Sequence, residues 1–189
     1  IKDTKGNTLE EIKIVQDGVT VTGADQLEQE RQALIAIYNA LDGPNWTNNE
    51  NWCSDKPLEE WYGVEVDPST GYVSMLQLGN NNLKGEIPSD IGVLKYVISL
   101  ELDFNNITGE IPIEMGNLES LSNINMSYTS ITGNVFDGIG NLKNLSTVQF
   151  IACDDITSIS EEIGQLENLT MLRISGSLTK YINCSLTYK

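Results

Sequence analysis

Apolar residues recur along this chain with a period of 24 residues from Tyr72 to the C-terminus. Five successive lines, which begin at residues 72, 96, 120, 144 and 168, align without any insertion. In each line, the second and third apolar residues of a set of three are separated by a single residue. This alternation predicts a short strand with its large side chains on one side. The columns are Val73, Val97, Leu121, Leu145 and Leu169; Leu76, Leu100, Ile124, Val148 and Leu172; Leu78, Leu102, Met126, Phe150 and Ile174.

Three residues after each predicted strand stands a column of side chains that can bond to backbone groups, namely Asn81, Asn105, Thr129 and Cys153. We interpret this column as a structural ladder, because backbone carbonyls inside a coil are out of reach of water and need donors. Each line then closes with two apolar residues three positions apart, a spacing suited to one helical turn, and glycine at 92, 116, 140 and 164 lies between them.

One line contains too few apolar side chains to form a core of its own. Neighbouring coils must therefore stack and share a continuous core, as in other repeat architectures. The periodicity alone thus predicts a quasi-linear solenoid.

The line "YVSMLQLGNNNLKGEIPSDIGVLK", residues 72–95, resembles the leucine-rich repeat in its plant-type 24-residue form, L-x-x-L-x-L-x-x-N-x-L-x-G-x-I-P-x-x-I-G-x-L. Cys153 followed by a late Ile156 is similar to an alternative of that family. The resemblance implies an α/β solenoid: a right-handed superhelix with a parallel concave sheet, short 3-10 or helical turns on the convex side, and an N-terminal α-helical cap. We assign residues 72–189 to five repeats, the last atypical, and expect a closing strand at the C-terminal end.

Residues 24–71 are predicted to form the N-terminal cap. From Asp25, apolar residues follow helical spacing until Gly43-Pro44, with Leu27, Leu34, Ile37, Tyr38 and Leu41 on one face; we place Glu28, Glu30 and Gln32 off that face. Such a helix can cover the first coil. Residues 1–23 form an extended lead or a short hairpin around Asp17-Gly18.

All three tryptophans, Trp46, Trp52 and Trp61, lie within this cap segment. They favour the hydrophobic filling of a small cap, with a sugar-stacking platform as the alternative. The segments "ALIAIYNALDGPNWTNNENW" and "EWYGVEVD" resemble the caps of bacterial secreted and cell-surface repeat proteins. The caps of plant receptors carry a C-x-W-x-G-V-x-C element with paired cysteines. The segment "EWYGVEV" resembles that element but has Val66 at the second cysteine position, so we expect a bacterial protein.

The net charge of −16 argues against binding to nucleic acid or to an anionic membrane. The chain contains no histidine, which removes histidine-activated nucleophiles and imidazole metal sites. Glu101 and Asp103 are the candidate catalytic carboxylates, but they share one strand of an open sheet instead of facing each other across a cleft. We therefore expect no enzyme, no cofactor and no metal.

The three cysteines are widely separated along the chain. A disulfide needs Cα atoms within about 7 Å, so we expect none that involves Cys53, and leave a bond between Cys153 and Cys184 open. No apolar run reaches the length of a membrane span. The chain begins at Ile1, so we expect a processed or trimmed product, with a lost signal or lipid-attachment segment as one explanation.

Strand residues that alternate with the core columns should form an exposed concave surface. Phe104 and Tyr128 follow two neighbouring strands at equivalent positions, so we expect an aromatic step on the rim and interpret it as the main binding determinant. The candidate partner-binding residues are Gln77, Glu101, Asp103, Phe104, Asn123, Asn125, Tyr128, Thr147, Gln149 and Arg173.

These features favour a non-catalytic protein-protein interaction module that binds a protein through its concave face and aromatic rim. The alternative is a carbohydrate-binding surface protein that uses the aromatic residues to bind a glycan. We expect a monomer located outside the cell or at its surface, with lipid anchoring through an upstream segment left open.

Overall fold

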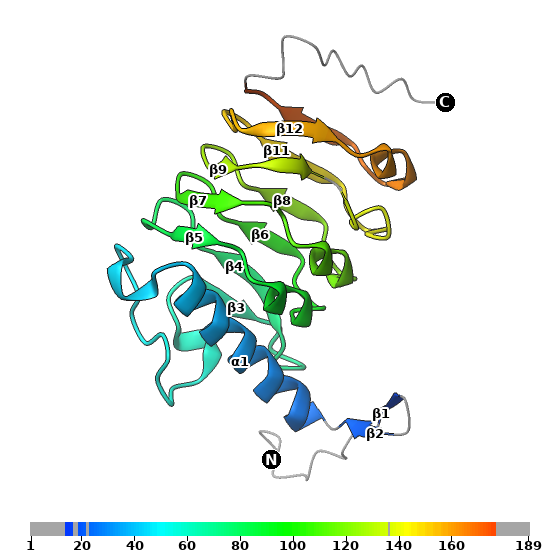
Figure 1. Cartoon of the computed structure of the whole chain (residues 1–189). Coiled ribbons are helices and arrows are strands. Elements are labelled where there is room, and N and C mark those ends of the chain that lie inside the picture. The colour runs from blue at the N-terminus through cyan, green and yellow to red at the C-terminus, as the bar shows by residue number, and fades with distance from the viewer. Residues whose placement is uncertain (1–13, 17–18, 22, 136, 177–189) are drawn as a thin grey trace.

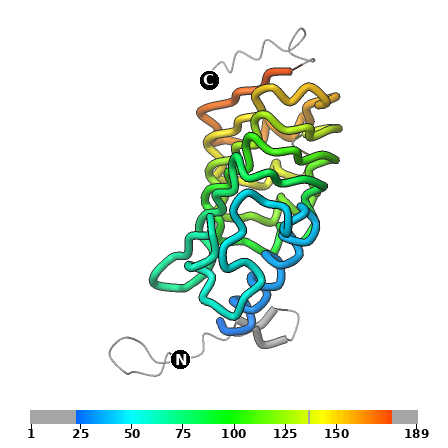
Figure 2. The backbone as a smooth tube through the Cα atoms, turned by 90° about the vertical axis from the view of Figure 1, so that its left-hand side faces the viewer, coloured from blue at the N-terminus to red at the C-terminus, as the bar shows by residue number. Residues whose placement is uncertain are grey.

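The computed structural model describes residues 14–16, 19–21, 23–135 and 137–176. These residues form a stack of coils that begins with a helix-containing cap (Figure 1). Seen from the side, the backbone passes through one coil after another in the same sense (Figure 2). Each repeat thus packs mainly on its neighbours, which confirms the predicted solenoid. The closing strand expected at the C-terminal end falls mostly on residues 177–189, outside the described residues.

A six-stranded sheet lines one side of the stack, in the order β13-β11-β8-β6-β4-β3. The five repeat strands are parallel, and only the cap strand β3 runs antiparallel to β4. Paired residues lie 24 positions apart, as in Met75 with Ser99, so each sequence column becomes a row across the sheet. The strands are β3 (Val64–Val66), β4 (Val73–Gln77), β6 (Ser99–Glu101), β8 (Asn123–Asn125), β11 (Thr147–Phe150) and β13 (Met171–Ile174).

Shorter strands lie on the return path of the coils, and three of the coils also contain a single 3-10 turn there. The strands β5, β7 and β9 form a second parallel sheet, and β10 pairs with β12 in a third. The strands are β5 (Lys84–Glu86), β7 (Asn106–Gly109), β9 (Ser130–Ile131), β10 (Gly133–Val135) and β12 (Ile156–Ile159). The 3-10 turns are Ser89–Val93, Ile113–Asn117 and Glu161–Gln165, at the predicted helical-turn positions.

The core lies between these two sides and runs through the whole stack. The column Leu76, Leu100, Ile124 and Val148 is completely buried, because each member packs against its equivalent in the next coil. Burial of one such aliphatic side chain contributes about 1.5–3 kcal/mol. The stabilisation therefore comes from repetition of the same contact along the stack.

Asn105 shows how the ladder holds two coils together. Its side-chain nitrogen donates to three backbone carbonyls and its oxygen accepts from two backbone N–H groups, at 2.8–3.1 Å; the partners are Leu78, Leu102 and Asp103 on the donor side, and Asn81 and Leu83 on the acceptor side. The shorter Thr129 and Cys153 side chains both reach the carbonyl of Met126.

The cap takes the place of a coil before the first repeat. Asn81 accepts from the backbone N–H of Asn48 at 2.7 Å and donates to its carbonyl at 2.9 Å, so the ladder continues into the cap loop. The helix α1 (Gly23–Ala40) packs Leu34 and Ile37 into the core, as predicted. Two 3-10 turns follow, at Gly43–Asn45 and Leu58–Glu60.

The position of Glu30 differs from the sequence-based interpretation. We placed this residue off the apolar face of α1, but its side chain is completely buried against the first repeat strand. Its Oε2 atom accepts a hydrogen bond of 2.8 Å from the backbone N–H of Val73, at the start of β4. Its Oε1 atom is buried without a partner among the described residues. Glu30 therefore joins the cap helix to the first repeat strand.

The three tryptophans fill the interior of the cap, so they do not form a sugar-stacking platform. All are buried, and Trp46 and Trp52 pack edge to face at 4.8 Å between ring centroids. Upstream, β1 (Ile14–Gln16) pairs antiparallel with β2 (Val19–Val21), in agreement with the hairpin alternative. Asp17 and Gly18, where the turn was expected, lie outside the described residues.

The glycine column on the 3-10 side offers a test of coil packing. A Cβ atom on Gly116 would lie 1.9 Å from the carbonyl oxygen of Gly138, whereas one on Gly164 would meet nothing within 4 Å. We expect Gly116→Ala to lower the free energy of unfolding by about 1–3 kcal/mol, because backbone must move to relieve the clash. Thermal unfolding followed by circular dichroism measures this loss.

Gly164→Ala is the matched control for this prediction. It replaces the equivalent glycine two coils later, in a similar 3-10 turn with free space, so stability should stay within about 0.5 kcal/mol of the parent chain. Equal losses in the two variants would contradict the close approach of the coils at Gly116.

Candidate functional site

The concave sheet brings most of the predicted binding residues together in two rows. Strand pairing aligns Gln77, Glu101, Asn125, Gln149 and Arg173 in one row across five strands. Asn123 and Thr147 belong to the adjacent row, while Asp103, Phe104 and Tyr128 follow the strand ends. Gln77 and Arg173 are exposed, and the polar residues between them are half-buried.

Side-chain hydrogen bonds fix part of this surface. The Asn123 amide donates to Ser99 Oγ at 2.9 Å and to Glu101 Oε1 at 3.2 Å, and Ser99 Oγ also donates to the same Glu101 oxygen. No described residue donates a hydrogen bond to the side-chain carboxylate of Asp103. Ser99 and Ser127 alternate with the core columns, a pattern that the sequence analysis expects on the exposed surface, but both are buried.

Phe104 and Tyr128 form the predicted aromatic step at the edge of the sheet. Their rings stack with centroids 4.2 Å apart and an angle of 10° between the ring planes. Nevertheless, the side chains remain 54% and 48% exposed. The stack therefore presents a large apolar area to the solvent, the kind of side chain that anchors protein interfaces.

The backbone at this step is unusual for aromatic residues. Phe104 and Tyr128 have φ angles of 54° and 56°, in the left-handed region, and Asn80 and Ala152 at the equivalent positions have 53°. This conformation suits glycine or asparagine and costs other residues roughly 1 kcal/mol. Two aromatic residues thus occupy positions where the backbone favours a smaller side chain.

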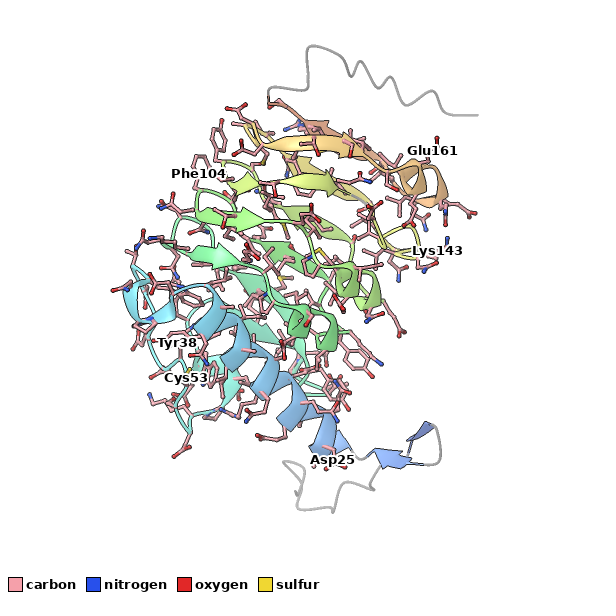
Figure 3. All side chains as sticks on the ribbon, in the orientation of Figure 1. Asp25, Tyr38, Cys53, Phe104, Lys143 and Glu161 are labelled. Carbon is pink, nitrogen blue, oxygen red and sulfur yellow. The ribbon has the colours of Figure 1, made fainter. Side chains whose placement is uncertain are left out.

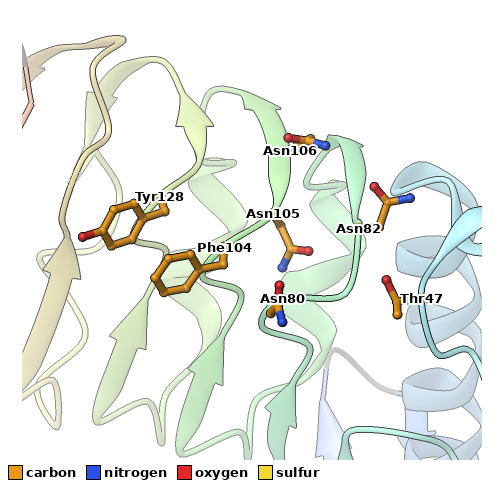
Figure 4. A pocket seen from close by; sticks show the side chains of 7 residues that line it. All are labelled: Thr47, Asn80, Asn82, Phe104, Asn105, Asn106 and Tyr128. Atoms are coloured by element: carbon orange, nitrogen blue, oxygen red, sulfur yellow. The ribbon is translucent and has the colours of Figure 1, made fainter.

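A pocket of about 350 Å³ adjoins the step on the side of the cap, as Figure 4 shows. Its lining combines the two aromatic residues with amide and hydroxyl side chains and contains no charged group: Thr47, Asn80, Asn82, Phe104, Asn105, Asn106 and Tyr128. We call it the amide–aromatic pocket. The cap residue Thr47 and the asparagines of this pocket were not among the predicted binding residues. The run Asn80-Asn81-Asn82 was the available signal in the sequence.

A second aromatic stack lies at the opposite ends of the strands. Tyr72 and Tyr96 stack with ring centroids 4.4 Å apart. Tyr96, together with Ile98, lines a hollow of about 520 Å³ beside this stack. Burial raises the pKa of the Tyr72 hydroxyl, and the proximity of Tyr96 and Glu30 contributes smaller effects in the same direction. This pair was not among the predicted binding residues, although both tyrosines occupy the first position of their lines.

Figure 3 shows side chains distributed over all described coils. None of the three hollows found among the described residues is lined by two carboxylates. Those residues also contain no group of three side chains able to hold a metal ion. Within the same ranges, no helix has the length and apolar character needed to cross a bilayer.

Cys53 is exposed in the cap and Cys153 is buried in the ladder, both as free thiols, while Cys184 lies outside the described residues.

The family model for the leucine-rich repeat matches residues 72–94 and 96–118, the first two predicted lines. Together with the stacked parallel coils and the asparagine ladder, this match decides the family. This chain is a leucine-rich repeat protein.

Two curated relatives from plants support that assignment. Receptor-like protein 50 of Arabidopsis thaliana is 30% identical over 36% of this leucine-rich repeat protein and 9% of the relative. A polygalacturonase inhibitor of Vitis vinifera is 30% identical over 36% of this chain and 20% of its own length. The chain therefore spans about a tenth and a fifth of these relatives.

Solved structures confirm the solenoid fold for most of the chain. A plant ice-binding protein matches 78% of this chain and 47% of its own with 28% identity and a TM-score of 0.68. A leucine-rich repeat protein from Bacteroides thetaiotaomicron matches 76% of this chain over 30% of its own length, with 17% identity and a TM-score of 0.62. Plant and bacterial proteins both resemble it, so a bacterial origin stays a prediction.

Proposed function

We propose that this leucine-rich repeat protein is a non-catalytic module that binds another protein through its concave sheet and the adjoining aromatic step, outside the cell or at its surface. The observation that carries the proposal is the exposed stack of Phe104 and Tyr128. Both residues sit where the backbone favours asparagine or glycine, so the fold itself gives no reason for aromatic side chains there.

The surface around the step suits a protein partner. Aromatic residues anchor interfaces, and the half-buried amides of Asn123, Asn125 and Gln149 can bond to a partner without the desolvation cost of charged groups. Asp103 offers a carboxylate free of ion pairs, next to Phe104. A cationic side chain of the partner would therefore find its counter-charge beside the apolar anchor.

The relatives agree with this assignment by name. One is a receptor-like protein and another is an inhibitor of an enzyme, and neither name describes a catalyst. One solved neighbour is the BIR2 ectodomain from Arabidopsis thaliana, which supports a location outside the cell or at its surface. We extend these properties to the present chain as part of the proposal.

The test compares three versions of the chain as bait for proteins from the source organism: the parent, the double variant Phe104→Asn/Tyr128→Asn, and Ile113→Asn. Asparagine suits the left-handed backbone of the step, so the double variant should fold normally. Ile113 is 66% exposed on a 3-10 turn away from the sheet and serves as the matched apolar control.

We expect a protein that the parent and Ile113→Asn retain and the double variant loses. With that protein purified, the double variant should raise Kd at least about tenfold, because a central anchor is removed. A change below about threefold, or an equal loss with Ile113→Asn, would show that the aromatic step is not the binding determinant.

A further inference from the structure

The aromatic stack stops at Phe104 on the side of the cap, and a pocket begins there. The equivalent residue one coil earlier is Asn80, which has the same backbone conformation but a short polar side chain. Figure 4 shows Phe104 between Tyr128 on one side and Asn80, Asn82 and Thr47 on the other. The ring of Phe104 therefore forms one wall of the amide–aromatic pocket, and the stack has room for one more ring.

The opposite walls carry polar groups that the fold does not use. The side chains of Thr47, Asn80 and Asn106 make no hydrogen bond to any described residue, and all three are exposed. Asn82 donates to the carbonyl of Asn45 at 2.7 Å and keeps its amide oxygen available. By contrast, Asn105 is engaged in the ladder and is not available to a ligand.

These groups define the chemistry of a ligand. Each free amide offers two donors and one acceptor, so several hydrogen bonds of both kinds can form around one bound ring. No lining residue is charged, and the net charge of −16 disfavours anionic ligands. The uncharged lining favours a neutral ligand that is rich in hydroxyl groups and apolar on one flat face.

We propose that the amide–aromatic pocket binds a neutral pyranose ring, whose C–H face stacks on Phe104 while its hydroxyls bond to Asn80, Asn106 and Thr47. An aromatic side chain of a partner would also stack, but it carries at most one polar group and would leave most of these amides unpaired. The pocket volume of about 350 Å³ lies at the lower end for small-ligand sites, which suits one ring better than an extended oligosaccharide. This sugar site adds to the proposed protein-binding role.

The experiment is a titration of the full chain with the methyl glycosides of glucose, mannose, galactose and xylose, followed through the NMR signals of the asparagine side-chain amides. Sodium glucuronate and N-acetyl-tyrosinamide serve as anionic and aromatic comparison probes. We expect at least one glycoside to shift the Asn80 and Asn106 signals saturably below about 50 mM, with neither comparison probe binding more tightly.

Variants then locate the site. Phe104→Asn should raise Kd for that glycoside at least about tenfold, and Asn106→Ala about threefold or more. Tyr96→Ala removes an aromatic residue from the stack at the opposite ends of the strands and should leave Kd within about twofold.

Three results would overturn the sugar site: no glycoside shifts these signals, Phe104→Asn leaves the affinity unchanged, or a comparison probe binds more tightly than every glycoside. The titration contains no partner protein. Its failure would therefore leave the proposed protein-binding function standing, and loss of partner capture would leave a sugar site standing.

Discussion

Asn105→Ala is expected to lower the free energy of unfolding by about 4 kcal/mol, the largest loss that we predict for a polar substitution. The side chain makes five hydrogen bonds to the backbone of two coils and is only 6% exposed. Alanine leaves those backbone groups without partners, and each buried unsatisfied group costs about 1–3 kcal/mol before water and relaxation compensate in part. Urea unfolding followed by circular dichroism measures the loss.

Thr129→Ala provides the matched control one coil later. Thr129 donates a single backbone hydrogen bond, of 2.7 Å to Met126, so its loss should cost about 1–2 kcal/mol. Asn105→Ala should therefore be clearly the more damaging change. If both variants lost the same stability, the number of ladder hydrogen bonds would not determine how firmly the coils are joined.

Glu30→Gln is expected to make the protein more stable at pH 8 but not at pH 4. Burial raises the pKa of the Glu30 carboxyl to about 7, against the lowering effect of the hydrogen bond from the Val73 backbone. In the unfolded chain the carboxyl has an ordinary pKa of about 4.5. Between these values the folded protein holds a proton that the unfolded chain has lost, so stability falls as pH rises from about 4.5 through 7.

The expected size of this effect follows from the shift. Each pKa unit corresponds to about 1.4 kcal/mol, so the shift from 4.5 to about 7 means that ionisation of Glu30 should cost the folded state about 3 kcal/mol by pH 8. Glutamine keeps an oxygen for the Val73 N–H and cannot ionise. Urea midpoints at pH 4 and pH 8 should therefore show the variant equal to the parent at pH 4 and more stable at pH 8.

Glu28→Gln is the control for this pH dependence. Glu28 lies on the same helix but is exposed, and its carboxylate accepts only a surface hydrogen bond from Gln32. Its replacement should change stability by less than about 0.5 kcal/mol at either pH. A Glu30→Gln protein that was less stable than the parent at pH 8 would mean that the ionised carboxylate is the form that holds the cap.

The 24-residue period allowed the repeat architecture to be predicted because the strands pair without slipping. Met75, Ser99 and Asn123 share one sequence column and one row of the sheet, so the spacing in the chain is also the spacing in space. The same argument placed Phe104 beside Tyr128, and their rings do stack. Where each coil copies the one before, neighbours in three dimensions can be counted along the sequence.

Features that depend on contacts between different kinds of element were harder to predict. Glu30 stands three residues after Leu27 and four before Leu34, which is the spacing of the buried face, yet its acidic character led us to place it outside. Ser99 and Ser127 alternate with core residues as exposed positions should, but both are buried, and their hydroxyls bond to the next coil. The amide–aromatic pocket combines a cap residue with three repeats, and no periodicity relates Thr47 to Asn106.

The most direct test of the proposed binding surface is site-specific photo-crosslinking to the captured partner. A photoreactive phenylalanine analogue would replace Phe104 at the aromatic step, Gln149 on strand β11 of the concave sheet, or exposed Ile113 on its 3-10 turn. We predict covalent adducts with the partner from positions 104 and 149 and none from position 113. Adducts from position 113 alone would contradict binding through the concave sheet and its aromatic step.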